Sequence, residues 1–358
     1  MGPRLKPAGD EGRIAPQEPG MLAEEICFAG SRGAFDMLLR RARGAVLGLT
    51  LAALAAIQSG SAAEWPTKPI RLVIPFGPAG VADLLGRVVA EHLQSELKQT
   101  VIVENRGGAS GLPAAAQVAR SEPDGYTLLL SGLATNVIAA AVSANPGFDT
   151  LRDFTHIAYL GGPPVGWIAA LSTDIRSVQD VLRLAREGQL IGYASSGVGT
   201  LGHLVTEYVI QKTGTPMNHI PYNTAVFTDL IAGRVPIASY AWSSIVGQVN
   251  GGTVRAIAVS SEARLPDFPD VPTFKELGFD LIARTWFAIS GPKGMPAEIV
   301  ERINKEMVKM FEGPTLRERL KQQSVDVKPM TPDELARHFE AEVLQWAPLA
   351  RSASTKKG

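Results

Sequence analysis

Short runs of apolar residues alternate along the chain with longer stretches in which apolar residues recur every three or four positions. The first strand-like run is Ile70–Pro75, and a helical pattern over Ala82–Leu97 follows it. A second strand-like run covers Val101–Glu104 and ends at the glycine pair Gly107–Gly108. This strand–helix–strand order predicts parallel sheets with helices on both faces.

The same alternation continues to the end of the chain. Further strands are predicted at Tyr126–Leu130, Ile157–Leu160, Gly166–Leu171, Leu190–Ala194, Asn218–Pro221, Ile237–Tyr240, Arg255–Val259 and Trp286–Ser290. Further helices are predicted at Ala114–Arg120, Val178–Arg186, Leu201–Thr213, Thr224–Ala232, Ile245–Asn250, Ala297–Phe311, Leu316–Gln323 and Pro332–Leu349. We expect the tail Ser352–Gly358 to be frayed.

Two segments are candidates for crossovers between domains. Gly161–Pro164 and Ala283–Thr285 each separate predicted strands. We therefore expect a discontinuous lobe 1, residues 64–162 and 286–358, with lobe 2, residues 163–285, inserted into it. Two α/β lobes joined in this way leave a cleft at the strand ends, where open α/β sheets bind ligands.

The N-terminal region has the pattern of an export signal. Arg40–Arg43 supplies basic residues, Ala45–Ile57 is an apolar run of 13 residues, and Ser59–Ala63 supplies small ones. The run is shorter than the roughly 20 residues of a spanning helix, which disfavours the alternatives of a retained anchor or a buried helix. We expect residues 37–63 to be a signal peptide cleaved after Ala63, giving a periplasmic protein. Residues 1–36 are then expected to be a disordered, over-extended start.

Composition narrows the function classes. The chain has 358 residues, 35 Lys and Arg against 35 Asp and Glu, and 45% hydrophobic residues, so it can build full cores. Zero net charge gives no electrostatic footprint for nucleic acid. The single cysteine, Cys27, precedes the expected cleavage site. The mature chain would therefore have no thiol nucleophile and no cysteine metal site.

The segment Gly197–Gly202 has the spacing G-x-G-x-x-G between a predicted strand and a predicted helix. A dinucleotide site would need an acidic residue after the next strand, but Asn218–Pro221 is followed by Tyr222–Thr224. No cofactor is therefore predicted. A glycine-rich turn before a helix still presents free backbone N–H groups, which suit a carboxylate or a phosphate.

The loop Phe76–Gly80 has the same pattern before the helix Ala82–Leu97, and Asp83 lies in that helix's first turn. Two such turns, one in each predicted lobe, could hold a small carboxylated molecule between them. From spacing alone, the alternative that both are ordinary strand-to-helix turns is equally good.

Catalytic patterns are sparse. There is no G-x-S-x-G motif and no histidine pair at metal-ligand spacing. Ser195 and Ser196 are better interpreted as hydroxyl donors to an anion than as nucleophiles. His203 follows the glycine-rich turn, where it could face the cleft or pack within the helix. Tyr222, at a strand end, could be a ligand contact or a core tyrosine.

Several segments resemble one known family in order along the chain, over essentially all of Glu64–Leu349. They are Lys68–Asp83 (KPIRLVIPFGPAGVAD), Val103–Gly111, Pro123–Leu129, Tyr193–Thr200, Ile220–Tyr222, Arg255–Val259, Pro266–Thr273, Gly294–Pro296 and Ile299–Asn304. On these motifs the chain is similar to the Bug family, the solute-binding receptors of tripartite tricarboxylate transporters.

The resemblance implies a type II-like periplasmic binding protein fold, with two doubly wound α/β lobes, a hinge and a ligand cleft between them. It also implies a carboxylated solute held by backbone N–H groups, hydroxyls and water at the strand-to-helix loops. Carried over by position, and with Asp83 added, the expected ligand-binding residues are Phe76, Gly77, Pro78, Ala79, Gly80, Val81, Asp83, Ser131, Ala134, Thr135, Ser195, Ser196, Gly197, Gly199, Thr200, His203, Tyr222, Asn223, Thr224 and Ala225.

The sequence departs from the family pattern at several of these positions. Ala79 replaces a glycine of the first loop, and Asn223–Thr224 replaces a cation and a glycine after Tyr222. Tyr240–Ala241 and Leu201 replace smaller or polar residues. A site with less positive charge and more bulk is expected to prefer a smaller, less charged or more apolar ligand.

The function implied is that of an exported, monomeric receptor for a small organic carboxylate, with no catalysis, no metal and no cofactor. Its partner would be the membrane subunits of a tripartite tricarboxylate-type transporter. Two alternatives remain open. One is a receptor that presents its ligand to a sensor kinase, and the other is an exported hydrolase using Ser195 or Ser196 with His203.

Overall fold

The structure is a computed structural model that describes residues 65–78, 81–222, 226–313, 320, 325 and 327–355. The chain from Ala63 to Gly358 forms one compact unit. The expected signal peptide and the segment before it lie outside the described residues, as does the expected helix Leu316–Gln323 apart from Leu320.

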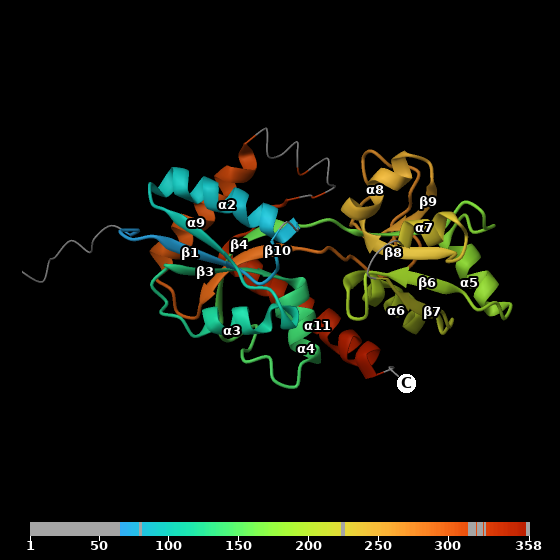
Figure 1. Cartoon of the computed structure of the whole chain (residues 1–358), viewed down its shortest axis with the longest axis horizontal. Coiled ribbons are helices and arrows are strands. Elements are labelled where there is room, and N and C mark those ends of the chain that lie inside the picture. The colour runs from blue at the N-terminus through green and yellow to red at the C-terminus, as the bar shows by residue number, and fades with distance from the viewer. Residues whose placement is uncertain are drawn as a thin grey trace, which may run out of the picture. The chain divides into compact units, whose positions relative to one another are not determined.

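The first sheet has five strands in the order β2-β1-β3-β10-β4 (Figure 1). Its strands are β1 (Ile70–Ile74), β2 (Val101–Asn105), β3 (Thr127–Gly132), β4 (Phe154–Gly161) and β10 (Phe287–Pro292). β1 pairs in parallel with β2 and β3, whereas β10 is antiparallel to both β3 and β4.

The second sheet also has five strands, in the order β7-β6-β8-β5-β9. Its strands are β5 (Val165–Ala170), β6 (Gly192–Ser195), β7 (Asn218–Pro221), β8 (Ile237–Ala241) and β9 (Val254–Val259). β6 pairs in parallel with β7 and β8, whereas β5 is antiparallel to β8 and β9.

The strand positions predicted from the sequence are confirmed, but the prediction of purely parallel sheets is wrong. Each sheet contains one antiparallel strand, β10 in the first and β5 in the second. These two strands are the ones that the chain enters directly from the other sheet. A strand entered in this way starts at the edge where its neighbours end, so it runs against them.

Helices cover both sheets. They are η1 (Ala109–Gly111, a 3₁₀ turn), α2 (Val81–Leu97), α3 (Leu112–Ala119), η2 (Leu133–Ala139, a π-helix), α4 (Ala140–Val142), α5 (Val178–Arg186), α6 (Leu201–Thr213), α7 (Val226–Ile231), α8 (Trp242–Asn250), α9 (Ala297–Glu312) and α11 (Pro332–Thr355). α2 and α9 pack on one face of the first sheet and α3 on the other (Figure 1). None of the described helices is long and apolar enough to cross a membrane.

The C-terminal helix is longer than predicted. α11 continues to Thr355, and Ala353 within it is buried, so the expected fraying from Ser352 onward is wrong for the described residues. The helix packs on η2, α4, β4 and α6. Burial of its apolar side against these elements explains why its last turns stay helical.

The two crossovers between the sheets run side by side. The Thr285 N–H donates to the Pro163 carbonyl oxygen at 2.9 Å, and Pro164 forms an antiparallel bridge with Arg284. Gly162 lies so close to the Thr285 carbonyl that a β-carbon at this position would overlap it. The division of the chain into lobes at these boundaries stays a prediction.

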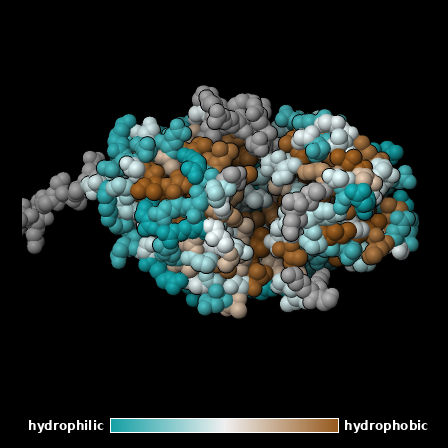
Figure 2. All heavy atoms as spheres, viewed as in Figure 1, coloured by the Kyte–Doolittle hydropathy of each residue, from teal (hydrophilic) through white to brown (hydrophobic). Residues whose placement is uncertain are grey.

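Hydrophilic and hydrophobic residues are interspersed on the face drawn in Figure 2. Two large apolar side chains, Val81 and Leu84, are more than half exposed at the start of α2. They adjoin the loop for which the sequence predicts ligand contacts.

Candidate functional site

The carboxyl ends of β2, β1 and β3 bring three loops together. Because these strands are parallel neighbours, their ends meet at one edge of the sheet. The Thr135 hydroxyl donates to the Ser110 carbonyl oxygen at 3.0 Å. A β-carbon at Gly111 would lie 2.6 Å from the Pro75 carbonyl oxygen and 2.9 Å from Thr135 Oγ1, so only glycine fits where the loops touch.

Asp83 is a buried anchor for the first of these loops. Its carboxylate accepts hydrogen bonds from Arg87 Nε at 3.1 Å and from Asn105 Nδ2 at 3.0 Å. Asn105 Nδ2 also lies 3.3 Å from the Phe76 carbonyl oxygen, so one amide group ties the end of β2 to the turn after β1. Asp83, which the sequence predicts as a ligand contact, is placed to hold the loop in shape.

We expect Asn105→Ala to lower the free energy of unfolding by about 1–3 kcal/mol, because the buried Asp83 carboxylate loses a donor. The measurement is chemical denaturation. Arg152→Ala is the control, and since this arginine is largely exposed and pairs with the exposed Asp149, we expect it to cost at most about 1 kcal/mol. Equal losses in the two variants would show that Asn105 does not anchor the turn.

The remaining predicted residues of the first sheet differ in exposure. Phe76 is half-buried and its ring packs edge-on against Phe287, with centroids 6.2 Å apart. Gly77, Pro78 and Val81 are exposed, whereas Ala79 and Gly80 lie outside the described residues.

After β3, only Ala134 of the predicted residues is exposed. Ser131 is fully buried inside the sheet, where its hydroxyl lies 2.7 Å from Ser290 Oγ and donates to the Ala288 carbonyl oxygen at 3.1 Å. Thr135 is also fully buried. These two hydroxyls support the loop from inside, and Ala134 is the position that solvent or a solute reaches.

In the second sheet, each glycine of the Gly197–Gly202 turn has its own structural reason. Gly197 and Gly199 have φ angles of +132° and +78°, which favour glycine. Gly202, in the first turn of α6, would bring a β-carbon into the Ser239 carbonyl. The spacing that imitates a dinucleotide motif therefore arises from a tight turn and from close packing of α6 on β8.

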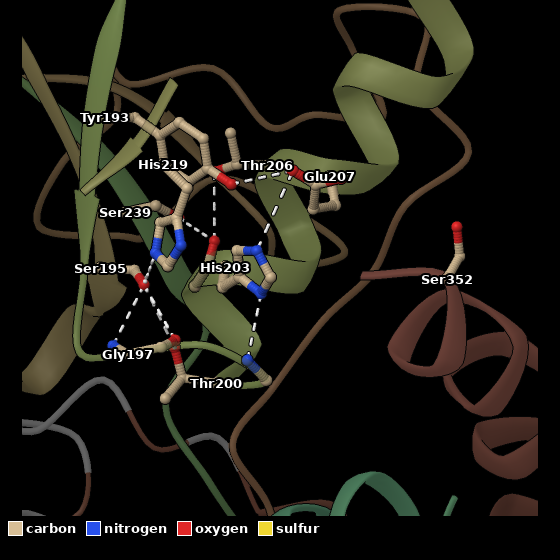
Figure 3. Close-up of polar contacts among 12 residues, drawn as sticks. Tyr193, Ser195, Gly197, Thr200, His203, Thr206, Glu207, His219, Ser239 and Ser352 are labelled. Atoms are coloured by element: carbon tan, nitrogen blue, oxygen red, sulfur yellow. Dashed lines mark hydrogen bonds and ion pairs between the residues drawn. The ribbon is translucent and has the colours of Figure 1, made fainter. Parts of the chain in front are cut away.

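Ser195 braces this turn from inside (Figure 3). Its hydroxyl accepts the Gly197 N–H at 3.2 Å and lies 2.8 Å from His219 Nε2. The Thr200 hydroxyl donates to the Gly197 carbonyl oxygen at 2.7 Å. Ser195 is fully buried, so its hydroxyl supports the loop, whereas the neighbouring Ser196 is exposed.

His203 lies at the centre of a buried polar cluster (Figure 3). The Gly199 N–H donates to His203 Nδ1 at 3.1 Å, while His203 Nε2 is 3.9 Å from Glu207 Oε1. The Tyr193 hydroxyl donates to the same Glu207 oxygen at 3.1 Å. The His203 and His219 rings are 4.1 Å apart, and burial lowers the pKa of His219 to about 4, with the nearby His203 adding to this effect.

Tyr193, Glu207 and His219 were not predicted from the sequence as site residues. Three signals could have found them. Tyr193 is two residues before Ser195 on a strand and so shares its face, Glu207 is four residues after His203 on a helix, and His219 pairs with Tyr193 across the β6–β7 register.

Tyr222 donates from its hydroxyl to Asp229 at 2.6 Å, and the predicted contacts Asn223, Thr224 and Ala225 lie outside the described residues. The two sheets' site regions approach each other through Gly199, where a β-carbon would lie 3.9 Å from Ile138 of η2. In the described part of the chain, no group of three or more His, Cys, Asp or Glu side chains is close enough to hold a metal ion.

Comparison with known families decides what this architecture is. The family described as "Tripartite tricarboxylate transporter family receptor" matches residues 85–354. The chain belongs to this family. The resemblance to Bug proteins is thereby confirmed, and so is the periplasmic-binding-protein fold with two α/β sheets.

Proteins similar to this receptor support the assignment to this family. Protein BugT of Bordetella pertussis is 31% identical over 87% of this chain and 97% of its own. The solved structure of periplasmic binding protein BugD is 30% identical, with a TM-score of 0.65, covering 81% of this chain and 99% of its own. R. palustris Rpa4515, solved with adipate, is 29% identical, with a TM-score of 0.69 and coverage of 81% and 99%.

Proposed function

We propose that this receptor is exported to the periplasm, binds a small organic carboxylate and delivers it unchanged to the membrane subunits of a tripartite tricarboxylate-type transporter. The ligand would lie between the turns after β1 and β3 and the turn after β6. Closure around it would follow from movement at the two crossovers, with the ligand favouring the closed form.

The observation that carries the proposal is the turn at the carboxyl end of β6, braced by Ser195 and His203 and followed directly by the first turn of α6. The first N–H groups of a helix have no partner within the helix, and they attract an anion. Residues 76–78, 131–135 and 195–203 contain no Lys or Arg. Such a site would neutralise a carboxylate with backbone dipoles.

The comparison with Rpa4515 supports an organic acid as ligand, because that protein was solved with adipate. A dicarboxylate of this kind has an apolar chain between two charged ends. It therefore fits a site in which Ala134 and Val81 offer apolar surface and a helix start offers N–H groups.

With Ser195 as the nucleophile, the hydrolase alternative is weaker on geometry. Ser195 lies beside His219 and not His203, and it is fully buried. A nucleophile in that position cannot reach a substrate without opening the turn that it braces. The sensor-kinase alternative shares the same ligand site and differs only in the partner.

We expect adipate-sized dicarboxylates to bind more tightly than citrate. The measurement is thermal shift, followed by calorimetric titration, of the purified protein with mono-, di- and tricarboxylates. A ligand at 100 times its Kd stabilises the native state by about 2.7 kcal/mol, which is easily detected. Tightest binding by citrate would contradict the expected size preference, and turnover of any ligand would contradict the receptor role.

A further inference from the structure

Behind the turn after β6 lies a cluster of buried polar side chains, and a turn can form with fewer such groups. Tyr193, Ser195, His203 and Glu207 are each at most 7% exposed, although all are polar. Burying such groups is costly unless each has a partner. The partners that the structure provides define which nitrogen of His203 carries a proton.

His203 Nδ1 faces a backbone amide. The Gly199 backbone N–H points to it at 3.1 Å, and an amide N–H can only donate. Nδ1 must therefore present its lone pair. In the neutral ring the proton is then on Nε2, on the side of Glu207 Oε1 at 3.9 Å.

Glu207 and His219 hold the His203 ring in this orientation. Glu207 is fixed by the Tyr193 hydroxyl, which burial keeps protonated because it raises the pKa of Tyr193. The face of the His203 ring lies against His219, with the centroids 4.1 Å apart. Among the residues that the structure describes, the titratable groups facing His203 include Glu207 on α6, Tyr193 on β6 and His219 on β7.

The turn itself is held from inside at two points. Gly197–Thr200 is braced at one end by Ser195, through the Gly197 N–H, and at the other by His203, through the Gly199 N–H. Two N–H groups of the turn are thereby engaged inside the protein. A solute bound at this turn would meet the start of α6, while His203 stays behind it.

We propose that His203 is a positioning residue, which in its neutral form holds the Gly197–Thr200 turn through the Gly199 N–H and does not itself contact the ligand. This inference rests on the proposed function, which supplies the ligand. Protonation of Nδ1 would turn the acceptor into a donor facing the Gly199 N–H, so the turn would have to move. Ligand binding should then weaken on acidification.

The test uses a matched pair of variants. In His203→Asn the amide oxygen takes about the place of Nδ1 and can still accept the Gly199 N–H. In His203→Gln the amide oxygen takes about the place of Nε2, and that acceptor is lost. Chemical denaturation of both variants verifies that they fold.

The first readout needs no ligand. Nitrogen-15 NMR of the ligand-free protein at pH 7.5 should show an unprotonated Nδ1 and a protonated Nε2 on His203. Hydrogen exchange at the Gly199 amide should be slow in the wild type and in His203→Asn, and about tenfold faster in His203→Gln. A protonated Nδ1, or equal exchange in the two variants, would overturn the inference whatever the ligand does.

The second readout is binding of adipate. We expect His203→Gln to weaken it about three- to tenfold, the value of one lost hydrogen bond, and His203→Asn to bind nearly as the wild type. From pH 7.5 to 5.5 the wild type should lose affinity relative to His203→Asn, a comparison that cancels protonation of adipate. A relative gain would indicate a direct contact between the imidazolium and the carboxylate and would overturn the inference. If hydrogen exchange at the Gly199 amide follows the expected pattern but the wild type binds no organic acid, the inference stands and the proposed function fails.

Discussion

Gly162→Ala is expected to lower the free energy of unfolding by about 3 kcal/mol, a cost typical of overpacking a well-filled site. The new β-carbon would overlap the Thr285 carbonyl and lie 2.7 Å from Trp286 Cα. All of these are backbone atoms of the second crossover, which cannot move away as a flexible side chain can. The crossovers would have to separate, at the cost of the hydrogen bond from the Thr285 N–H to the Pro163 carbonyl oxygen.

Gly247→Ala is the matched control for this prediction. Gly247 lies in α8, where a β-carbon would meet nothing within 4 Å. We expect this change to stabilise the protein by about 1 kcal/mol, because alanine favours a helix over glycine. Both variants are measured by urea denaturation. A Gly162→Ala protein as stable as the wild type would show that the crossovers are not packed as described.

A large pH effect is expected from Glu342. This carboxylate on α11 is buried and accepts hydrogen bonds from two indole N–H groups, Trp286 at 2.7 Å and Trp346 at 3.2 Å. Burial raises its pKa to about 7, while the two indoles act in the opposite direction. Between the ordinary value of 4.5 and about pH 7, the folded state keeps a proton that the unfolded state releases.

The contribution of Glu342 to stability therefore falls as the pH rises through this window, by on the order of 3 kcal/mol. Glu342→Gln keeps an oxygen for the indoles and cannot ionise. We expect its free energy of unfolding to rise relative to the wild type from pH 4.5 to pH 7, and to keep a constant difference above that. Urea denaturation of both proteins across this pH range measures the difference.

Three histidines, His156 (buried) and His219 and His338 (both half-buried), act in the opposite sense in an overlapping window. Burial lowers the pKa of His156, His219 and His338 to about 4, so each stabilises the native state above pH 6.5 and loses that contribution as the pH falls toward 4. Comparison of variant with wild type isolates Glu342 from them. Glu340→Gln, at an exposed position of the same helix, should follow the wild-type curve. Parallel curves for Glu342→Gln and the wild type would contradict a buried ionisation.

Much of the fold could be predicted because buried positions recur at regular intervals along strands and helices. The run Ile70–Ile74 is almost continuously apolar and forms a central strand, and the three-to-four spacing in Val81–Leu97 forms a helix. The structure extends or shortens such elements by only a few residues. The glycines of Gly197–Gly202 lie at a turn between β6 and α6, as their pattern between a strand and a helix predicts.

The polar partners could not be predicted in the same way. The His203 and His219 ring centroids are 4.1 Å apart although the residues are 16 positions apart in sequence, because β7 pairs beside β6 and α6 packs on the same sheet. Ser131 and Ser195, which the sequence predicts as ligand contacts, are fully buried. Their environment depends on which way each strand end turns, and local spacing does not record this.

The sequence by itself determined the strands, most of the helices, the family and the turns at which a ligand is expected. These follow from local periodicity, from backbone conformations that only glycine adopts easily and from motifs read in order. The tertiary structure alone decided the direction of β5 and β10, the pairing of His203 with the Gly199 N–H and the burial of Glu342 between two tryptophans. The reason is physical: strand direction, hydrogen-bond partners and desolvation depend on contacts between segments far apart in the chain, and these exist only after the chain has folded.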